Sequence, residues 1–431
     1  MKHRSRIVFF TIILAIVLIV NTSCRTSYVN TEFVPDFSQE RMLDIIETMS
    51  AEDGGRIAGF DGEAQTAEYI IGKYNEIGLS VSRQSFPVKA FTCKSVSFVN
   101  NLSQEVLIDV KALSFSAPTP AEGITAEVIP VGMGTESDFE EIDVKGKIAL
   151  IRRGGEYFRD KTQRAADHGA VAAVFYDPNG EEALAATLTY LSAIPAISIS
   201  RKKAEAMEKS VSGGNKVEAK IIVDSIYRDS LSENVIGVYK STNNPEGKYV
   251  VVGAHYDGVD TPAANDNASG VAVLIEMAAA LKEQKIRLPY DVAFIAFGAE
   301  EIGLLGSSAY VGKMSRTDLR KIIAMINFDM VGVGEYFDLY TADGTDATGL
   351  QKSMIAVLER MGHTPAISKT ERSDHTPFSY SGIQAVDVQM SPPGHYHTDF
   401  DNIDAIQPEL LEKVCEFGIR VLTEELVTWV E

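Results

Sequence analysis

The sequence predicts an α/β protein with a mostly parallel central sheet flanked by helices and a smaller β-rich domain inserted into it. From residue 226 to 431, strand-like and helix-like segments alternate, as expected when each pair of parallel strands is joined by a crossover helix. Between 111 and 225 the pattern changes to short strands and turns. With 431 residues and 45% apolar content, the chain can form a core in each of two domains.

The elements of the larger domain follow from the spacing of apolar residues. In its N-terminal part, 36–110, helical spacing predicts two helices, the second ending at Gly78. In its second part, 226–431, apolar and β-branched runs predict strands at 248–257, 290–301, 321–332 and 384–390. The segments between and after them predict helices at 269–284, 303–314, 351–362 and 408–426. Within the inserted domain, 111–225, shorter runs predict strands at 145–155, 170–178 and 194–200 and a helix at 160–170.

The first 24 residues have the features of a targeting segment. Basic "MKHRSR" precedes an apolar run over 7–20, which is short for a membrane span and suits a signal peptide. Cys24 follows in "VNTSC", a position that resembles the lipid-modified cysteine of bacterial lipoproteins, with Asn21 where leucine is usual. We therefore expect an exported cell-envelope lipoprotein with a linker over 25–35. Ordinary cleavage and retention as an N-terminal anchor stay open.

Charge and cysteine content exclude some functions. The formal net charge of −20, from 60 acidic and 40 basic residues, repels nucleic acid and anionic lipid surfaces, so neither is an expected partner. Membrane contact is expected only through the N-terminal segment. Cys93 and Cys415 have no metal-binding or redox spacing, so a disulfide between them and two inert thiols both remain open.

Chemically active side chains follow the predicted strands of the larger domain. In open α/β sheets, ligands bind outside the carboxyl ends of the strands. The ends of the predicted strands, with the loops that follow them, carry His255, Asp257, Glu300, Glu301, Asp329 and His397. Asp266 lies in the loop between the strand at 248–257 and the helix at 269–284. We therefore expect these side chains to converge on one edge of the sheet.

Convergence of so many carboxylates requires a positive charge among them. Buried and unpaired, each ion would cost several kcal/mol, and Lys and Arg are scarce next to these strand ends. Histidine together with carboxylates is a ligand set suited to zinc. Two Zn²⁺ and one hydroxide would balance the charges of Asp266, Glu301 and Asp329, which predicts two zinc ions per chain.

Six motifs in order resemble those of a known family. They are "HYD", "NDNASG", "FGAEEIGLLGS", "NFDMVG", "SDHTPF" and "YHTDFDN". Together they resemble the co-catalytic di-zinc exopeptidases, which include secreted bacterial aminopeptidases, with relatives in glutamate carboxypeptidase II and the transferrin receptor. The resemblance covers 226–431 and the helices before 111, and the segment 111–225 resembles the protease-associated domain often inserted in these enzymes. It implies a zinc exopeptidase-like fold and peptide substrates.

The resemblance implies a role for each residue at the sheet edge. His255, Asp266 and Asp329 would hold one zinc, and Asp266, Glu301 and His397 the other, with Asp266 bridging. Asp257 would accept the free imidazole N–H of His255.

The resemblance also implies how the reaction would run. Zinc lowers the pKa of a bound water to about 7, and Glu300 would act as general base toward it. Tyr396 and Arg372 would stabilise the oxyanion, although a structural ion pair would explain Arg372 equally well. His375 matches a motif without occupying a ligand position, so we expect it to be structural.

These residues together predict a zinc aminopeptidase that releases N-terminal residues from peptides. A carboxypeptidase of the same family and a non-catalytic, receptor-like relative are the alternatives. A glutaminyl cyclase fits less well, because those relatives use a single zinc and generally lack the inserted domain. Nothing in the sequence predicts an oligomeric state.

Overall fold

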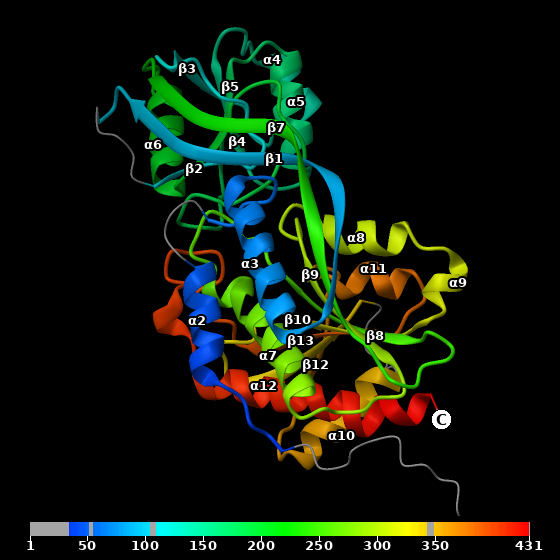
Figure 1. The fold of residues 1–431 in the computed structure, drawn as a ribbon. Helices are drawn as coiled ribbons and strands as arrows, with labels where there is room; N and C mark the ends of the chain where they lie inside the picture. Colours follow the sequence, from blue (N-terminus) through cyan, green and yellow to red (C-terminus); the bar gives the residue numbers. More distant parts are fainter. Residues whose placement is uncertain (1–33, 51–54, 104–108, 343–348, 431) are drawn as a thin grey trace, which may run out of the picture. The chain divides into compact units, whose positions relative to one another are not determined.

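The computed structural model describes residues 34–50, 55–103, 109–342 and 349–430 (Figure 1). The expected targeting segment, 1–24, lies outside the described residues. The chain divides into two compact units. The larger unit contains the described residues of Met1–Arg56, Ala64–Phe86 and Glu233–Glu431, and the smaller unit contains those of Ile57–Glu63 and Pro87–Ser232.

Four parallel strands form the centre of the larger unit's sheet. They are β8 (Tyr249–His255), β9 (Asp291–Phe297), β10 (Ile322–Phe328) and β13 (Ala385–Ser391), in the order β13-β10-β8-β9. β10 pairs in parallel with both β8 and β13, and β8 pairs in parallel with β9. All four carboxyl ends therefore meet at one edge, which is the requirement on which the predicted site depends.

Outer strands extend this sheet on both sides. β11 (Tyr336–Thr341) is antiparallel to β13, and β12 (Ala366–Lys369) is parallel to β11. The last residues of β7 (Glu218–Tyr239) run antiparallel to β9. The mostly parallel α/β sheet predicted from the alternation of elements is confirmed. The outer strands were not predicted, because their polar residues interrupt the apolar pattern.

Helices cover both faces of the sheet. On one face lie α2 (Gln39–Met49), α3 (Asp61–Ile77), α7 (Gly270–Glu283), α10 (Gly349–Arg360) and α12 (Pro408–Arg420); on the other lie α8 (Leu305–Gly312) and α11 (His375–Tyr380) (Figure 1). Successive residues of β8 point to opposite faces of the sheet. Val250 and Val252 belong to the core beneath α2, α3, α7, α10 and α12, and Val251 belongs to the core beneath α8 and α11. From Gly270 to Leu281 every residue of α7 is buried, as expected for a helix that is apolar on all sides.

The shorter elements of the larger unit lie at its loops and its C-terminal end. They are η1 (Ala264–Ser269), α9 (Arg316–Leu319), η2 (Ile403–Ala405), η3 (Val421–Glu425) and η4 (Leu426–Trp429). η1 leads directly into α7 and carries Asp266.

The smaller unit contains its own series of paired strands and two hydrophobic cores. β3 (Ile124–Pro130), β4 (Ile148–Arg152), β5 (Ala172–Tyr176) and β6 (Ala196–Ile199) are parallel in that order, and β2 (Val110–Ala112) is antiparallel to β6. α6 (Arg201–Ser212) packs on one face, and α4 (Glu136–Glu141) and α5 (Phe158–Asp167) pack on the other.

Two long strands belong to both units. β1 (Ser80–Asn100) pairs with β7, and the first part of β7 is antiparallel to β3. For this reason the smaller unit begins before residue 111 and ends after residue 225. Cys93 on β1 is half-buried, Cys415 in α12 is buried, and in the described part of the chain no disulfide joins them. No helix within the described ranges is long and apolar enough to cross a membrane.

Candidate metal centre

Three strand ends and two loops bring the predicted ligands together. His255 is the last residue of β8, Asp329 directly follows β10, and Glu301 lies in the turn after β9. Asp266 lies in η1, and His397 lies in the loop after β13. His255, Asp266 and Asp329 are buried, and the other two are partly exposed. The parallel sheet thus places residues from five distant segments at a single edge.

Asp266 lies between the two histidines. Its Oδ1 is 3.1 Å from Nε2 of His255, and its Oδ2 is 3.1 Å from Nε2 of His397. The His255 Nε2 also lies 3.4 Å from Oδ1 of Asp329, and the His397 Nε2 lies 3.2 Å from the carboxylate of Glu301. Each carboxylate oxygen of Asp266 is therefore available to a different group of ligands.

These residues fit divalent metal ions. His255, Asp266 and Asp329 offer ligand atoms within 4.8 Å of one another, and so do Asp266, Glu301 and His397. Among the described residues the buried Oδ1 of Asp329 has no hydrogen-bond partner, so it is available to bind a cation. Imidazole nitrogens with carboxylate oxygens at such separations suit zinc.

A third grouping uses Glu300. Its carboxylate, the Glu301 carboxylate and an imidazole nitrogen of His255 also offer ligand atoms within 4.8 Å of one another. That grouping would take His255 and Glu301 away from the first two, which together share Asp266 alone. The pair of groups that share Asp266 therefore uses the five residues without competition and leaves Glu300 free.

The charges in this cluster shift the pKa values of both histidines upward. Burial by itself lowers the pKa of His255, but the nearby Glu300 and Asp329 carboxylates raise it well above its usual value. Burial likewise disfavours the charged form of His397, whereas hydrogen bonds to Asp266 and Glu301 raise its pKa to about 10. The cluster thus attracts positive charge strongly, because protons are drawn to the nitrogens that face the carboxylates.

Burial has the opposite effect on the two adjacent glutamates. It raises the pKa of Glu301 to about 7, with the Asp266 carboxylate adding to the shift, and it raises the pKa of Glu300 well above its usual value. A carboxylate with a raised pKa accepts a proton readily near neutral pH. Glu300 is therefore buried, lies close to His255 and can accept a proton.

Asp257 holds the turn that carries these glutamates. Its Oδ1 accepts the backbone N–H of Glu300 at 2.9 Å, and its Oδ2 accepts that of Glu301 at 3.1 Å. Nδ1 of His255 lies 3.2 Å from the main-chain oxygen of Asp257 and 3.6 Å from its carboxylate. Because a carbonyl accepts, Nδ1 donates and Nε2 remains free for a metal. β8 ends at His255, so the contact to Asp257 comes from a turn and not from a continued strand face.

The two residues expected at the oxyanion lie in different surroundings. The Tyr396 ring stacks on the His397 ring with centroids 3.7 Å apart, and Tyr396 is 51% exposed. Burial of its hydroxyl and the Asp266 and Glu301 carboxylates raise the pKa of Tyr396, so it stays a hydrogen-bond donor at neutral pH. Arg372 is exposed, and in the described part of the chain its guanidinium makes no ion pair and no hydrogen bond to the cluster.

Backbone strain is concentrated beside the ligands. Ala299, Met330 and His397 have φ values of 53°, 53° and 55°, which side chains other than glycine rarely adopt. Ala299 precedes Glu300, and Met330 follows Asp329. Strained non-glycine residues are typical of functional sites, where the surrounding structure holds them in place.

Arg56 is a buried cation that sequence reasoning missed. The side chain is 3% exposed and donates hydrogen bonds to the main-chain oxygens of Met49, Tyr256 and Ala263 at 2.6–2.8 Å. Burial lowers its pKa to about 10, against the opposing effect of nearby carboxylates such as Asp257, so it remains charged at neutral pH. It lies 199 positions before His255 in the sequence and belongs to none of the six motifs.

Two further polar side chains near the cluster also lacked a sequence signal. Ser373 Oγ donates to Oδ2 of Asp329 at 2.7 Å and accepts from Asn327 at 2.8 Å. The buried Asp401 contacts the segment that contains Asp266 through two backbone N–H groups. Ser373 belongs to the motif "SDHTPF" and Asp401 to "YHTDFDN", but the sequence predicted functional roles only for other residues of these motifs.

His375 is fully buried beside this network. Its Nε2 donates to the main-chain oxygen of Thr370 at 3.1 Å, and burial lowers its pKa to about 4. When a histidine is neutral and buried in the folded protein, its protonation favours the unfolded state. In the unfolded chain its pKa is about 6.5, so the unfolded state takes up the proton first as the pH falls from 6.5 towards 4.

We expect His375→Gln to reduce the acid sensitivity of the fold. Linkage with these two pKa values predicts that wild type loses about 2 kcal/mol of unfolding free energy between pH 7 and pH 5 because of His375. Glutamine keeps a donor for Thr370 and does not titrate, so the variant should lose about 2 kcal/mol less. Urea unfolding of both proteins at the two pH values measures this difference. Equal losses would show that His375 is not neutral in the fold.

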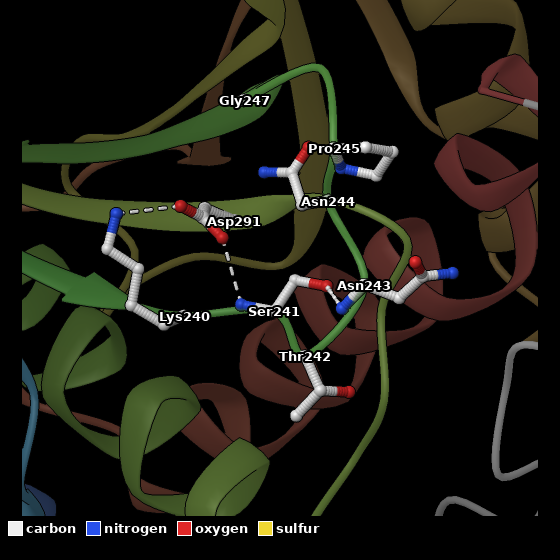
Figure 2. Close-up of a pocket in the computed structure, with 8 residues that line it drawn as sticks. All are labelled: Lys240, Ser241, Thr242, Asn243, Asn244, Pro245, Gly247 and Asp291. Carbon is white, nitrogen blue, oxygen red and sulfur yellow. Dashed lines mark hydrogen bonds and ion pairs between the residues drawn. The ribbon is translucent and has the colours of Figure 1, made fainter.

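A surface cavity lies at the opposite ends of the strands. It has a volume of about 590 Å³ and is lined by the loop from Lys240 to Gly247 and by Asp291, the first residue of β9 (Figure 2). The Lys240 Nζ pairs with Asp291 at 2.8 Å, and the Asp291 carboxylate also accepts the Ser241 N–H (Figure 2). This cavity is therefore separate from the metal ligands, which follow the carboxyl ends of the strands.

Imidazole and carboxylate side chains that meet at the carboxyl edge of a parallel sheet define a metal-dependent α/β enzyme site. The chain belongs to Peptidase family M28, whose sequence pattern matches residues 234–421, and the pattern of a PA domain matches residues 122–207. The family resemblance and the inserted domain inferred from the motifs are confirmed.

Relatives and solved structures cover nearly the whole chain. Aminopeptidase YwaD of Bacillus subtilis (strain 168) is 33% identical over 400 residues, which are 89% of this chain and 84% of that protein. The crystal structure of BSAP, a zinc aminopeptidase from Bacillus subtilis, matches with a TM-score of 0.77 and 31% identity, covering 91% of this chain and 96% of that chain. The probable lipoprotein aminopeptidase LpqL of Mycobacterium tuberculosis (strain ATCC 25618 / H37Rv) is 29% identical over 360 residues, 78% of this chain and 69% of that protein.

Proposed function

We propose that this protein is a zinc aminopeptidase that hydrolyses the N-terminal peptide bond of exported or extracellular peptides. The observation that carries the proposal is the position of Asp266, whose two carboxylate oxygens each lie 3.1 Å from a different histidine. Such a carboxylate is suited to bridge two metal ions. The aminopeptidase relatives described above support the same conclusion.

Five residues would hold the metal. His255, Asp266 and Asp329 would bind one zinc ion, and Asp266, Glu301 and His397 would bind a second. Bound zinc supplies Lewis-acid chemistry, which polarises the scissile carbonyl and makes a water acidic enough to attack it near neutral pH.

Glu300 moves the protons of the reaction. Its backbone is held by the Asp257 carboxylate, and burial raises the pKa of its side chain, so it can accept a proton from the attacking water. The same carboxyl group then returns that proton to the departing amine nitrogen. Burial keeps bulk water away from the carboxylate while it is protonated.

Tyr396 is assigned to the developing oxyanion. Its hydroxyl stays protonated because burial and the surrounding carboxylates raise its pKa, and its stacking on His397 places the ring beside the second metal group. Arg372 was expected to share this role. We leave it out of the mechanism because its side chain is exposed and has no hydrogen bond or ion pair to the cluster among the described residues.

The charge of the site favours an amine over a carboxylate at the substrate terminus. Carboxylates of Asp257, Asp266, Glu300, Glu301, Asp329 and Asp401 surround it. The buried cation nearby, Arg56, already donates to backbone oxygens and has little capacity left for a substrate carboxylate. Two zinc ions and Arg56 would offset five of these six negative charges, and the charge that remains favours a free N-terminal ammonium group over a C-terminal carboxylate. This supports an aminopeptidase over a carboxypeptidase.

Zinc analysis and blocked peptides test the proposed function. We expect purified protein to carry zinc, to lose activity with a chelator and to regain it when zinc is added back. A peptide with a blocked carboxylate should be cleaved, and the same peptide with a blocked amine should not. Cleavage of only the amine-blocked peptide would contradict the aminopeptidase assignment, and failure to bind zinc would favour the receptor-like alternative.

We also propose export of the protein as a lipoprotein anchored at Cys24. The basic and apolar residues before Cys24 support this, and so does the relative described as a probable lipoprotein aminopeptidase. Globomycin-type inhibition of lipoprotein processing should cause a larger precursor to accumulate. A Cys24→Ala protein that still partitions with membranes after processing would contradict the anchor.

A further inference from the structure

Asp401 joins two loops that carry metal ligands. It lies four positions after His397 and is 3% exposed. Its Oδ1 accepts the backbone N–H of Asn265 at 2.7 Å, and its Oδ2 accepts the backbone N–H of Asp266 at 3.1 Å. Its main-chain oxygen also accepts the N–H of Ala264 at 3.1 Å. Three consecutive residues ending at Asp266 are thus bound to this one residue.

The position is costly for a carboxylate. Asp401 lies beside Asp266 in a cluster that already carries an excess of negative charge, and burial adds a desolvation cost. The two N–H groups and the nearby Arg56 offset part of that cost. An uncharged residue would avoid this cost. A carboxylate, however, has two acceptor oxygens, and here each of them binds one of the two N–H groups.

The other ligands have independent supports. Asp329 is held by Ser373, Glu301 by the Asp257 carboxylate at its backbone N–H, and His255 by the main-chain oxygen of Asp257. For His397, the described residues provide hydrogen bonds only at Nε2, the atom that faces the carboxylates. The position of His397 relative to Asp266 therefore depends on the chain between it and Asp401.

Local turns make that chain stiff. The Asp401 N–H donates to the oxygen of Thr398 at 3.0 Å, and the Thr398 N–H donates to the oxygen of His395 at 3.2 Å. His397 lies inside this pair of turns at a φ of 55°. A displacement of Asp401 would consequently move His397 and release the backbone of Asp266 at the same time.

We propose that Asp401 is a positioning residue that couples His397 to Asp266 and thereby sets the zinc affinity of the group formed by Asp266, Glu301 and His397. This inference rests on the proposed function. Residues that hold metal ligands in place without binding the metal themselves contribute about 10–100-fold to metal affinity. Asp266 belongs to both ligand groups, but His255 and Asp329 have supports of their own, so the effect of Asp401 is larger at the metal held with Glu301 and His397.

The test compares Asp401→Asn with wild type and with Asp399→Asn. Asparagine has the same shape but one acceptor oxygen, and its NH₂ group would face a backbone N–H. Asp399 is an exposed acid in the same loop, so its variant controls for the loss of one charge. Zinc affinities are measured by titrating metal-free protein against a chromophoric chelator, and the thermal unfolding of the metal-free proteins is recorded alongside.

We expect Asp401→Asn to weaken one zinc site about 10–100-fold and to weaken the other, which shares only Asp266 with it, clearly less. Asp399→Asn should leave both unchanged. Unchanged affinities in Asp401→Asn, or equal losses at both sites, would overturn the proposal, even if the melting temperature falls. Asp401→Glu, which keeps two acceptor oxygens, should bind the weakened zinc better than Asp401→Asn does.

The same titration separates this inference from the proposed function. Wild-type stoichiometry tests the two-zinc centre, whereas the ratio of variant to wild-type affinity tests Asp401. If wild type binds a single zinc ion, the two-zinc proposal fails. In that case a 10-fold or larger loss for that ion in Asp401→Asn still supports the coupling, and an unchanged affinity refutes it.

Discussion

Glu300→Gln should lower kcat about 10²–10⁴-fold while the protein retains its zinc, because general-base catalysis contributes a factor of this size. Glutamine has the same shape but cannot accept a proton from the attacking water. The backbone of residue 300 would still be held by Asp257, so the turn that carries Glu301 should not move. Steady-state kinetics on an unblocked peptide, with metal analysis of the same sample, measure both quantities.

The neighbouring residue provides the matched control. Glu301→Gln also removes one carboxylate from the same turn, but we expect it to weaken zinc binding because Glu301 faces His397 at 3.2 Å. Adding zinc should therefore restore part of the activity of Glu301→Gln and none of that of Glu300→Gln. Near wild-type turnover in Glu300→Gln would refute the assignment of the base, and loss of zinc in that variant would make Glu300 a ligand.

Asp266→Asn should have a comparable effect through the metals. Its side chain would present one oxygen and one NH₂ group to the two histidines that now each face an oxygen at 3.1 Å. One zinc ion should then be lost at micromolar free zinc. The rate should fall about 10³-fold, since one metal contributes several kcal/mol of transition-state stabilisation.

An exposed acid in the same loop controls for charge. Asp260 lies between Asp257 and Asp266 in the sequence and is exposed, so Asp260→Asn should keep both metals and full activity. Zinc content after dialysis distinguishes the two variants. If Asp266→Asn retains two tightly bound zinc ions, Asp266 is not the shared ligand and the proposed centre is wrong.

Much of the larger unit could be predicted from local sequence patterns. The strands β8, β9, β10 and β13 appear as runs of apolar residues, and α7 appears as a long apolar helix, because burial on both sides removes polar residues from these elements. β1 and β7 were not predicted as long strands. Their alternation is broken by half-exposed polar residues, so the period of two is lost.

The expected metal ligands could be named in advance for a related reason. Each follows the end of a predicted strand or begins the next helix, and parallel strands bring those positions to a common edge. The structure places His255, Asp266, Glu301, Asp329 and His397 close together, as the sequence led us to expect. Arg372 had the same motif support as its neighbours, but its side chain is exposed and no hydrogen bond or ion pair among the described residues links it to the cluster, because a motif does not state which way a side chain points.

The sequence by itself determined the class of fold, the identity of the residues at the sheet edge and the kind of ion that they suit. Periodicity and residue type carry that information, since both depend on near neighbours in the chain. Only the tertiary structure decided how those residues are held. Arg56 and Asp401 act on backbone groups about 200 and 135 positions away, and a backbone N–H or carbonyl looks the same in every residue. Hydrogen bonds of that kind leave no pattern in the sequence of the segment that receives them.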